Sequence, residues 1–323
     1  EIISAGDVPL GTQGNLFGIT GGEGTGKSNY VAAIVAGCIC PAGADIDTLG
    51  IQITANGRHK AVLLYDTEQS EVQLFKNVSN LLARAKQPDK PDELKAFCLT
   101  GMSRKERLNA IVQSMDKFYY QYGGIQLVVI DGIADLVKSA NDEAESVAVI
   151  DELYRLAGIY NTCILCVLHF VPNGLKLRGH LGSELQRKAA TILSIEKDEE
   201  PAQSVVKALK VRDGSPLDVP LMLFAWDKEA GMHVYKGEKP REEKEKRKER
   251  ELVNVARDIF GRQTRITYID LCEQLQQVLD IKERTAKSYI RFMRERDIIT
   301  KDTANQSCFV IGSYNLQRNA SCP

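Results

Sequence analysis

The sequence predicts an α/β fold: a mainly parallel sheet with helices on both faces, ending in an antiparallel meander. Short apolar runs alternate with longer segments of helical spacing over residues 14–235, which is typical of parallel sheets covered by helices. A glycine-rich segment lies between the first apolar run and the first helix, as in phosphate-binding folds. A highly charged stretch at residues 237–251 separates this pattern from a second, smaller one at residues 252–312.

The elements of the first domain follow from length and spacing. Strands are expected where apolar runs are short, and helices where apolar residues recur every three or four positions. The strands are expected at residues 15–20, 61–65, 95–99, 126–130 and 162–168, and the helices at residues 27–40, 70–86, 104–122 and 143–160. The meander is expected at residues 190–196, 204–211 and 220–225, which have no helix of useful length between them.

A second domain follows the charged stretch. Residues 237–251 carry mixed charge and almost no apolar side chain, so a solvated helical linker is expected there. Three helices and then two strands are expected at residues 253–260, 267–279, 282–296, 298–301 and 308–311. This order resembles a winged helix–turn–helix domain. The predicted divisions are a first domain at 1–236, a second domain at 252–313 and a tail at 314–323.

Composition excludes little. The formal net charge is −1 and the pI is about 6.5, so a nucleic-acid partner must be argued from local charge. The sequence has no apolar run of about 18 residues and no basic-then-apolar leader. Cys163 and Cys166 would point to opposite faces of a strand, which is wrong for a shared metal. The eight cysteines are therefore expected to be reduced thiols of a soluble, cytoplasmic protein.

Residues 21–28 match the phosphate-binding loop (P-loop) pattern G-x-x-x-x-G-K-[ST] in full. The residues expected to bind nucleotide are Gly21, Gly22, Glu23, Gly24, Thr25, Gly26, Lys27, Ser28 and Asn29. Glycines let backbone N–H groups turn toward phosphates, and the following helix adds its positive end. Lys27 would reach the β- and γ-phosphates, and Ser28 would coordinate Mg²⁺. A glycine turn without a ligand is the weaker alternative, because a strand precedes this loop and a helix follows it.

Further polar residues follow the predicted strands. Asp131 ends an apolar strand and is expected beside Mg²⁺, partly through water. Glu68 lies just past the strand at 61–65, where a carboxylate orients and polarises the attacking water. His169 ends the strand at 162–168 and would report the γ-phosphate. Structural alternatives stay open: Glu68 as a helix N-terminal charge, and His169 as a packed strand-end residue.

Lys210 and Arg212 belong to a late K-x-R-x-G segment and alternate on one strand face. Taken with the P-loop, Glu68, Asp131 and His169, this segment resembles the RecA-like ring ATPases over about residues 10–235. The resemblance is above all to the plasmid RepA-type and DnaB-type replicative helicases. It implies a RecA-like P-loop core that hydrolyses ATP with Mg²⁺. It also implies that Lys210 and Arg212 reach the γ-phosphate of a neighbouring subunit, so that the active enzyme is a homo-oligomer, a hexameric ring. The alternative is that both cations are only solvated.

DNA is the partner that the resemblance implies. The family's DNA-contacting loops would lie at residues 135–144 and 170–181, and the second carries Lys176 and Arg178 among glycines. In the predicted helix 282–296, a basic face lies opposite an apolar one, as a recognition helix requires. Its basic residues are Arg284, Lys287, Arg291 and Arg294. A winged-helix domain used for protein contacts is the alternative reading.

Three functions remain at this point. The first is a ring DNA helicase that replicates or mobilises a plasmid, phage or transposon. The second is a non-translocating ATPase in which ATP switches DNA binding or regulation. A small-molecule P-loop kinase is disfavoured, because no phosphoryl acceptor pocket or lid is evident and Lys210 and Arg212 would have no role.

Overall fold

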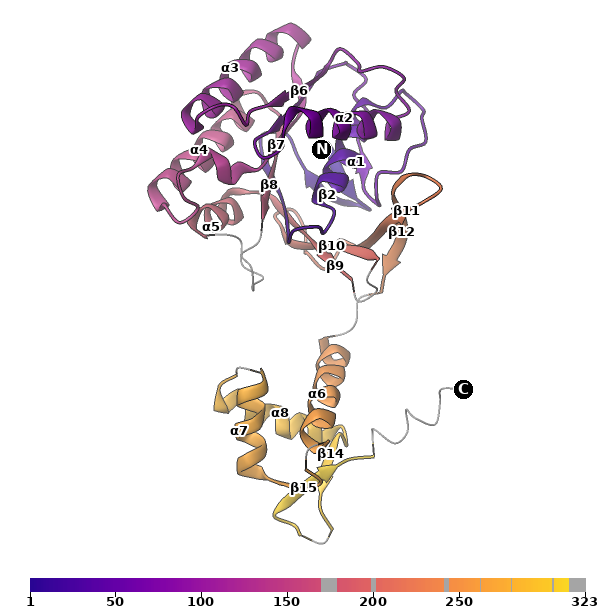
Figure 1. Ribbon diagram of the computed structural model, residues 1–323, viewed down its shortest axis with the longest axis vertical. Coiled ribbons are helices and arrows are strands. Elements are labelled where there is room, and N and C mark those ends of the chain that lie inside the picture. Colours follow the sequence, from indigo (N-terminus) through magenta and orange to yellow (C-terminus); the bar gives the residue numbers. More distant parts are fainter. Residues whose placement is uncertain are drawn as a thin grey trace. The chain divides into compact units, whose positions relative to one another are not determined.

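The computed structural model describes the chain at residues 1–169, 179–198, 202–240, 244–261, 263–279, 281–303 and 305–313. The chain divides into two units, Glu1–Lys239 and Pro240–Pro323 (Figure 1). Two hydrophobic clusters stabilise the first unit and a third stabilises the second. Among the helices in the described ranges, none is long and apolar enough to cross a membrane.

A nine-stranded sheet in the order β12-β11-β10-β9-β3-β8-β7-β5-β6 forms the centre of the first unit (Figure 1). Its strands are β3 Leu16–Gly21, β5 Ala61–Asp66, β6 Leu94–Cys98, β7 Ile125–Asp131, β8 Cys163–His169, β9 Thr191–Lys197, β10 Gln203–Val211, β11 Leu221–Asp227 and β12 Met232–Lys239. The pairings from β9 through β3 and β8 to β6 are parallel, and those from β9 to β12 are antiparallel. This confirms the predicted α/β fold with its late meander, and it is consistent with a RecA-like P-loop core.

Helices cover both faces of this sheet. They are α1 Lys27–Ile39, α2 Glu71–Arg84, α3 Arg104–Tyr122, α4 Glu143–Ile159 and α5 Gly179–Lys188. Side chains of α1 and α2 share one hydrophobic cluster, and those of α3, α4 and α5 share the other. Along β7, Val129 joins the first cluster, whereas Val128 and Ile130 join the second. Cys163 and Cys166 likewise belong to opposite clusters, as predicted, which rules out a metal site shared between them.

The edges of this unit differ from the prediction. The predicted loop at 170–181 overlaps α5, because Leu181 and Leu185 form a buried stripe that favours a helix despite its glycines. The predicted linker at 237–251 overlaps β12, a polar edge strand whose only partner is β11 and which shows no apolar alternation. A small sheet of β1 Ile3–Ala5, β2 Val8–Gly11 and β4 Gln52–Ile53 was not predicted, since its strands are too short to show a period.

The second unit has three helices and a three-stranded sheet in the order β13-β15-β14. Its elements are α6 Lys244–Phe260, β13 Ile266–Thr267, α7 Tyr268–Leu279, α8 Glu283–Glu295, β14 Ile299–Lys301 and β15 Cys308–Ile311. Leu252, Leu271, Ile290 and Phe309 are buried together in its core. The first helix was expected from residue 253, but α6 begins at Lys244, so part of the charged stretch forms its first turns.

Candidate active site

The P-loop connects the end of β3 to the first residue of α1, Lys27. Gly26 is the N-cap residue with φ 92° and Gly24 has φ 68°, a region that favours glycine. A Cβ at Gly21 would lie 2.4 Å from the carbonyl oxygen of Ile195, so β9 leaves no room for a side chain there. Gly26 has no side chain to cap α1, and the first turn of α1 carries no acidic residue. The positive end of this helix is therefore suited to an anion such as phosphate.

Lys27 is buried at 7% exposure, and its ammonium lies over the loop. Nζ donates to the carbonyl oxygens of Gly21 at 3.0 Å and Gly22 at 2.7 Å, and contacts Nδ1 of His169 at 3.1 Å. Burial lowers the pKa of Lys27, opposed by the carboxylates of Asp131, Glu68 and Glu23. The carbonyl oxygens of Gly21 and Gly22 are neutral acceptors, so transfer of the ammonium to a phosphate oxygen would break no ion pair with either of them.

His169 bridges Lys27 and Glu68. Its Nε2 lies 3.2 Å from Oε2 of Glu68, while Nδ1 contacts the Lys27 ammonium. An ammonium can only donate, so Nδ1 must accept and the ring proton must lie on Nε2, directed at the Glu68 carboxylate. The predicted sensor and the predicted water-activating carboxylate are thus in direct contact, and the sensor also contacts the P-loop lysine.

Asp131 lies at the carboxyl end of β7, in register with Asp66 on β5. Burial raises the pKa of Asp131 to about 7, assisted by the Asp66 and Glu68 carboxylates and opposed by His169 and Lys27. A divalent cation would neutralise this crowded negative charge. The Ser28 hydroxyl and the Asp131 carboxylate line the same cavity and are the hard oxygen donors that Mg²⁺ prefers. No group of three or more His, Cys, Asp or Glu within the described ranges could hold a metal, so Mg²⁺ would rely on phosphate and water for its other ligands.

Three residues that sequence reasoning missed hold Glu68 in place. The Asp66 carboxylate accepts the backbone N–H groups of Glu68 at 3.0 Å and Gln69 at 2.8 Å. Thr67 Oγ1 donates to the carbonyl oxygens of Asp131 at 3.0 Å and Gly132 at 2.8 Å, which ties the end of β5 to the end of β7. Gly132 has φ 96°, and a Cβ there would lie 2.6 Å from Cγ of Glu68. Polar residues directly after apolar strands were the available signal for Asp66 and Thr67.

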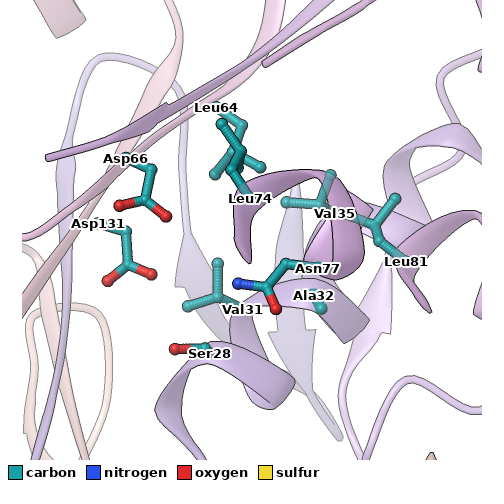
Figure 2. A pocket seen from close by; sticks show the side chains of 10 residues that line it. All are labelled: Ser28, Val31, Ala32, Val35, Leu64, Asp66, Leu74, Asn77, Leu81 and Asp131. Atoms are coloured by element: carbon teal, nitrogen blue, oxygen red, sulfur yellow. The ribbon is translucent and has the colours of Figure 1, made fainter. Parts of the chain in front are cut away.

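A cavity of about 300 Å³ joins these groups. It is lined by Gly24, Gly26, Lys27, Ser28, Asn29, Glu68, Gln69, Asp131, His169 and His233. A second cavity of about 30 Å³, roughly the volume of one water, lies behind it between α1, α2, β5 and β7. Figure 2 shows Asp66 and Asp131 side by side in this smaller cavity, with Ser28 and the Asn77 amide nearby. The larger cavity thus combines a phosphate loop, a carboxylate beside it for a metal and a second carboxylate for activating water.

Residues 5–173 match the protein family described as AAA domain, a span of more than half of the 323 residues. The chain belongs to this family. It is a P-loop NTPase, and membership implies binding of ATP and Mg²⁺ in general. No curated protein matches the chain. The matched span of the AAA domain includes the P-loop, Glu68, Asp131 and His169, and it ends before α5.

Lys210 and Arg212 do not line the cavity of this AAA domain; within one chain they cap α5. Lys210 Nζ donates to the carbonyl oxygens of Gln186 at 2.6 Å and Arg187 at 3.0 Å. Arg212 Nη2 donates to the carbonyl oxygen of Lys188 at 3.2 Å. Cations at a helix C-terminus stabilise its dipole by about 0.3–1 kcal/mol each. Both side chains therefore have a structural role in the chain that carries them.

The candidate DNA-binding residues lie outside the span that matches the AAA domain. Lys176 and Arg178 are outside the residues that the structure describes. The other four are exposed on α8: Arg284, Lys287, Arg291 and Arg294. Two of them make i,i+4 ion pairs, Lys287 with Glu283 at 2.7 Å and Arg291 with Glu295 at 2.8 Å. Such exposed pairs contribute little to stability and leave both cations accessible to a phosphate backbone.

Proposed function

We propose that this chain is an ATP-hydrolysing DNA motor, a ring helicase resembling the plasmid RepA type, which replicates or mobilises a plasmid, phage or transposon. The observation that carries the hydrolytic part is the contact between Glu68 and His169, with His169 in turn on Lys27. Glu68 is connected to the P-loop lysine through His169. A carboxylate in this position suits activation of a water molecule for hydrolysis rather than activation of a phosphoryl acceptor.

The ring part rests on Lys210 and Arg212. Among the described residues that line the cavity, Lys27 is the only lysine or arginine, whereas transition-state charge in such enzymes is commonly neutralised by an additional arginine supplied in cis or in trans. Arg212 contacts the end of α5, and neither it nor Lys210 lines the cavity of its own chain. In this proposal both cations complete the site of the next subunit, in a closed homo-hexamer.

The DNA part rests on α8 and on the basic segment that includes Lys176 and Arg178. In α8, Ala286, Ile290 and Met293 are buried, and the four basic residues are exposed on the other side. Three helices with a terminal hairpin suit a winged-helix domain at residues 252–313, attached to a motor at residues 1–236. Phosphate contacts by these cations would make DNA binding strongly dependent on salt.

A complementation assay tests the ring. Lys27→Ala removes the P-loop cation and Arg212→Ala removes the finger, so each variant alone is expected to lose ATPase activity by about 10³-fold. Mixed in equal amounts, they form interfaces in which an intact P-loop meets an intact Arg212, and a substantial share of the wild-type rate is expected to return. Mixtures that stay inactive, or an Arg212→Ala variant with the wild-type rate, would refute the trans arrangement. Arg155→Ala, which removes an exposed helical ion pair with Glu152, is the matched control.

The DNA role is tested by ATPase rates with and without single-stranded DNA, followed by strand separation of a forked duplex. Stimulation together with separation is expected for the helicase. Nucleotide-dependent duplex binding without separation would favour the second function, an ATP-switched DNA-binding protein, for which the paired cations on α8 are suited. Failure to bind either form of DNA at low salt would refute both.

A further inference from the structure

The meander strands contribute one residue to the nucleotide cavity. His233 on β12 lines the cavity together with the P-loop, Glu68, Asp131 and His169. In the sheet, β3 separates the strands that carry the hydrolytic residues (β8, β7 and β5) from the meander β9 to β12. A triphosphate with its γ-end at Glu68 therefore has its nucleoside end directed toward the meander.

Aromatic rings surround His233 at this end. Its imidazole lies 5.6 Å from the ring of Phe224 and 5.5 Å from the indole of Trp226, both edge-on. Phe224 is fully buried, and its Cε2 would lie 2.8 Å from a Cβ at Gly26, so it packs directly beneath the P-loop. Trp226 is 55% exposed, which leaves a large flat surface beside the cavity open to a ligand.

The His233 ring favours its uncharged form, and its Nδ1 has no protein hydrogen bond within the described residues. Its Nδ1 is buried without a partner there, while its backbone carbonyl oxygen accepts from the guanidinium of Arg84. Burial lowers the pKa of His233, with the charges of Arg84 and Lys197 acting in the same direction. Arg84 also donates to the carbonyl oxygen of Asp47 at 2.8 Å, and the Asp47 carboxylate accepts the N–H of Tyr235 at 2.7 Å, so β12 is fixed beside α2. The backbone of His233 is anchored, and a neutral ring suits stacking against another aromatic system.

We propose that the β11–β12 hairpin forms the base-binding wall of the nucleotide site, with the purine ring packing between the rings of His233 and Trp226, stacked on one and edge-on to the other. This inference rests on the proposed ATP hydrolysis and adds the residues that recognise the nucleoside. The wall distinguishes a nucleoside triphosphate from inorganic tripolyphosphate, which reaches only the P-loop.

Trp226 is the single tryptophan of the chain, so intrinsic fluorescence reports this wall directly. Binding of ATP and of tripolyphosphate, each with Mg²⁺, is measured by calorimetry and by tryptophan fluorescence. ATP is expected to quench the fluorescence, and tripolyphosphate is expected to bind without quenching. His233→Asn and, separately, Trp226→Ala are expected to weaken ATP binding by about ten-fold and to leave tripolyphosphate binding unchanged, since stacking on one ring contributes roughly this much.

His59→Asn is the matched control, because His59 is exposed and pairs with Glu93. It lies just before the first residue of β5, at the end of this strand away from Glu68. Lys27→Ala is expected to weaken the binding of both ATP and tripolyphosphate. The base-binding wall is refuted if wild-type protein binds ATP without a fluorescence change and both wall variants bind ATP as tightly as wild type. This outcome would leave the proposed ATP hydrolysis untouched. If wild-type protein binds neither ligand, the proposed function itself fails and the wall fails with it. Exposure of Trp226 makes Trp226→Ala the variant least at risk of misfolding.

Discussion

Asp66 is expected to position Glu68, so replacing it should slow turnover without weakening nucleotide binding. Its carboxylate accepts two backbone N–H groups, from Glu68 at 3.0 Å and Gln69 at 2.8 Å. Hydrogen bonds to a charged group contribute about 1.5–3 kcal/mol each, and a shift of about 1 Å in a catalytic group costs roughly 100-fold in rate. Asp66→Ala is therefore expected to lower kcat by about 100-fold, and Asp66→Asn, which keeps one acceptor oxygen, by about ten-fold.

The assay is steady-state phosphate release together with the Kd for ATP measured by calorimetry. Because the hydrogen bonds of Asp66 to Glu68 and Gln69 do not involve Lys27, the Kd is expected to stay within about two-fold of wild type. Asp142→Ala is the control: Asp142 accepts the N–H of Glu145 at 3.0 Å and caps α4, so its loss should cost about 1 kcal/mol of stability and no activity. Wild-type kcat in Asp66→Ala would refute the positioning role. A large rise in Kd with unchanged kcat would assign Asp66 to binding instead.

Stability separates positioning from misfolding. Burial raises the pKa of Asp66 and outweighs the two backbone hydrogen bonds that lower it. An acid with a raised folded-state pKa binds its proton more readily in the native state, so its ionised form at neutral pH opposes folding. Asp66→Asn is thus expected to keep or raise Tm while kcat falls. A lowered Tm would mean that lost structure explains the lost rate.

Three further predictions follow. Gly132→Ala is expected to cost about 1–3 kcal/mol of stability and to slow turnover, because φ is 96° and the added Cβ would lie 2.4 Å from Thr67 Oγ1. Thermal unfolding measures the loss of stability, and kcat measures the slower turnover. Asp131→Asn should raise Tm at pH 8 by a few degrees in EDTA and raise it less near pH 5, because the carboxyl group, with a pKa near 7, is protonated in the native state there and only the smaller cost of taking up that proton remains. Equal shifts at both pH values would contradict this. Ile290→Ala, at 1% exposure, is expected to destabilise the second unit by about 2–5 kcal/mol without changing DNA-independent ATPase activity.

The buried strands could be predicted because each one is apolar on both faces. Burial under helices on both faces leaves no polar alternation, so β7 and β8 can be recognised in the sequence as continuous apolar runs. Because these strands are parallel, the polar residues at their carboxyl ends lie at one edge of the sheet. This is why residues of the P-loop, Glu68, Asp131 and His169, all predicted at strand ends, line one cavity in the structure. Their positions in the sequence, combined with the parallel direction of the strands, were sufficient to predict that these residues lie near one another.

Residues whose role depends on contacts between distant parts of the sequence, or on a backbone hydrogen bond, could not be predicted in this way. His233 is separated from the P-loop by about two hundred positions, and it reaches the cavity only because β12 pairs with β11 on the far side of the meander. Nothing in the polar sequence of β12 indicates that pairing. Asp66 was passed over because its function is to hold the backbone of Glu68, and a hydrogen bond of this kind has no sequence pattern beyond a polar residue after a strand.

His169 links the P-loop lysine to the water-activating carboxylate through one ring. The contact with the Lys27 ammonium places the ring proton on Nε2, where it faces Glu68. If Lys27 turns to a phosphate oxygen, Nδ1 loses this donor, and the orientation of the ring is no longer determined by the loop. Asp66 holds the backbone of Glu68 in either case, so the Glu68 carboxylate is then expected to exchange His169 for water. For the proposed hydrolysis, this arrangement predicts that Glu68 pairs with His169 while Lys27 rests on the loop and turns to water when Lys27 moves to a phosphate.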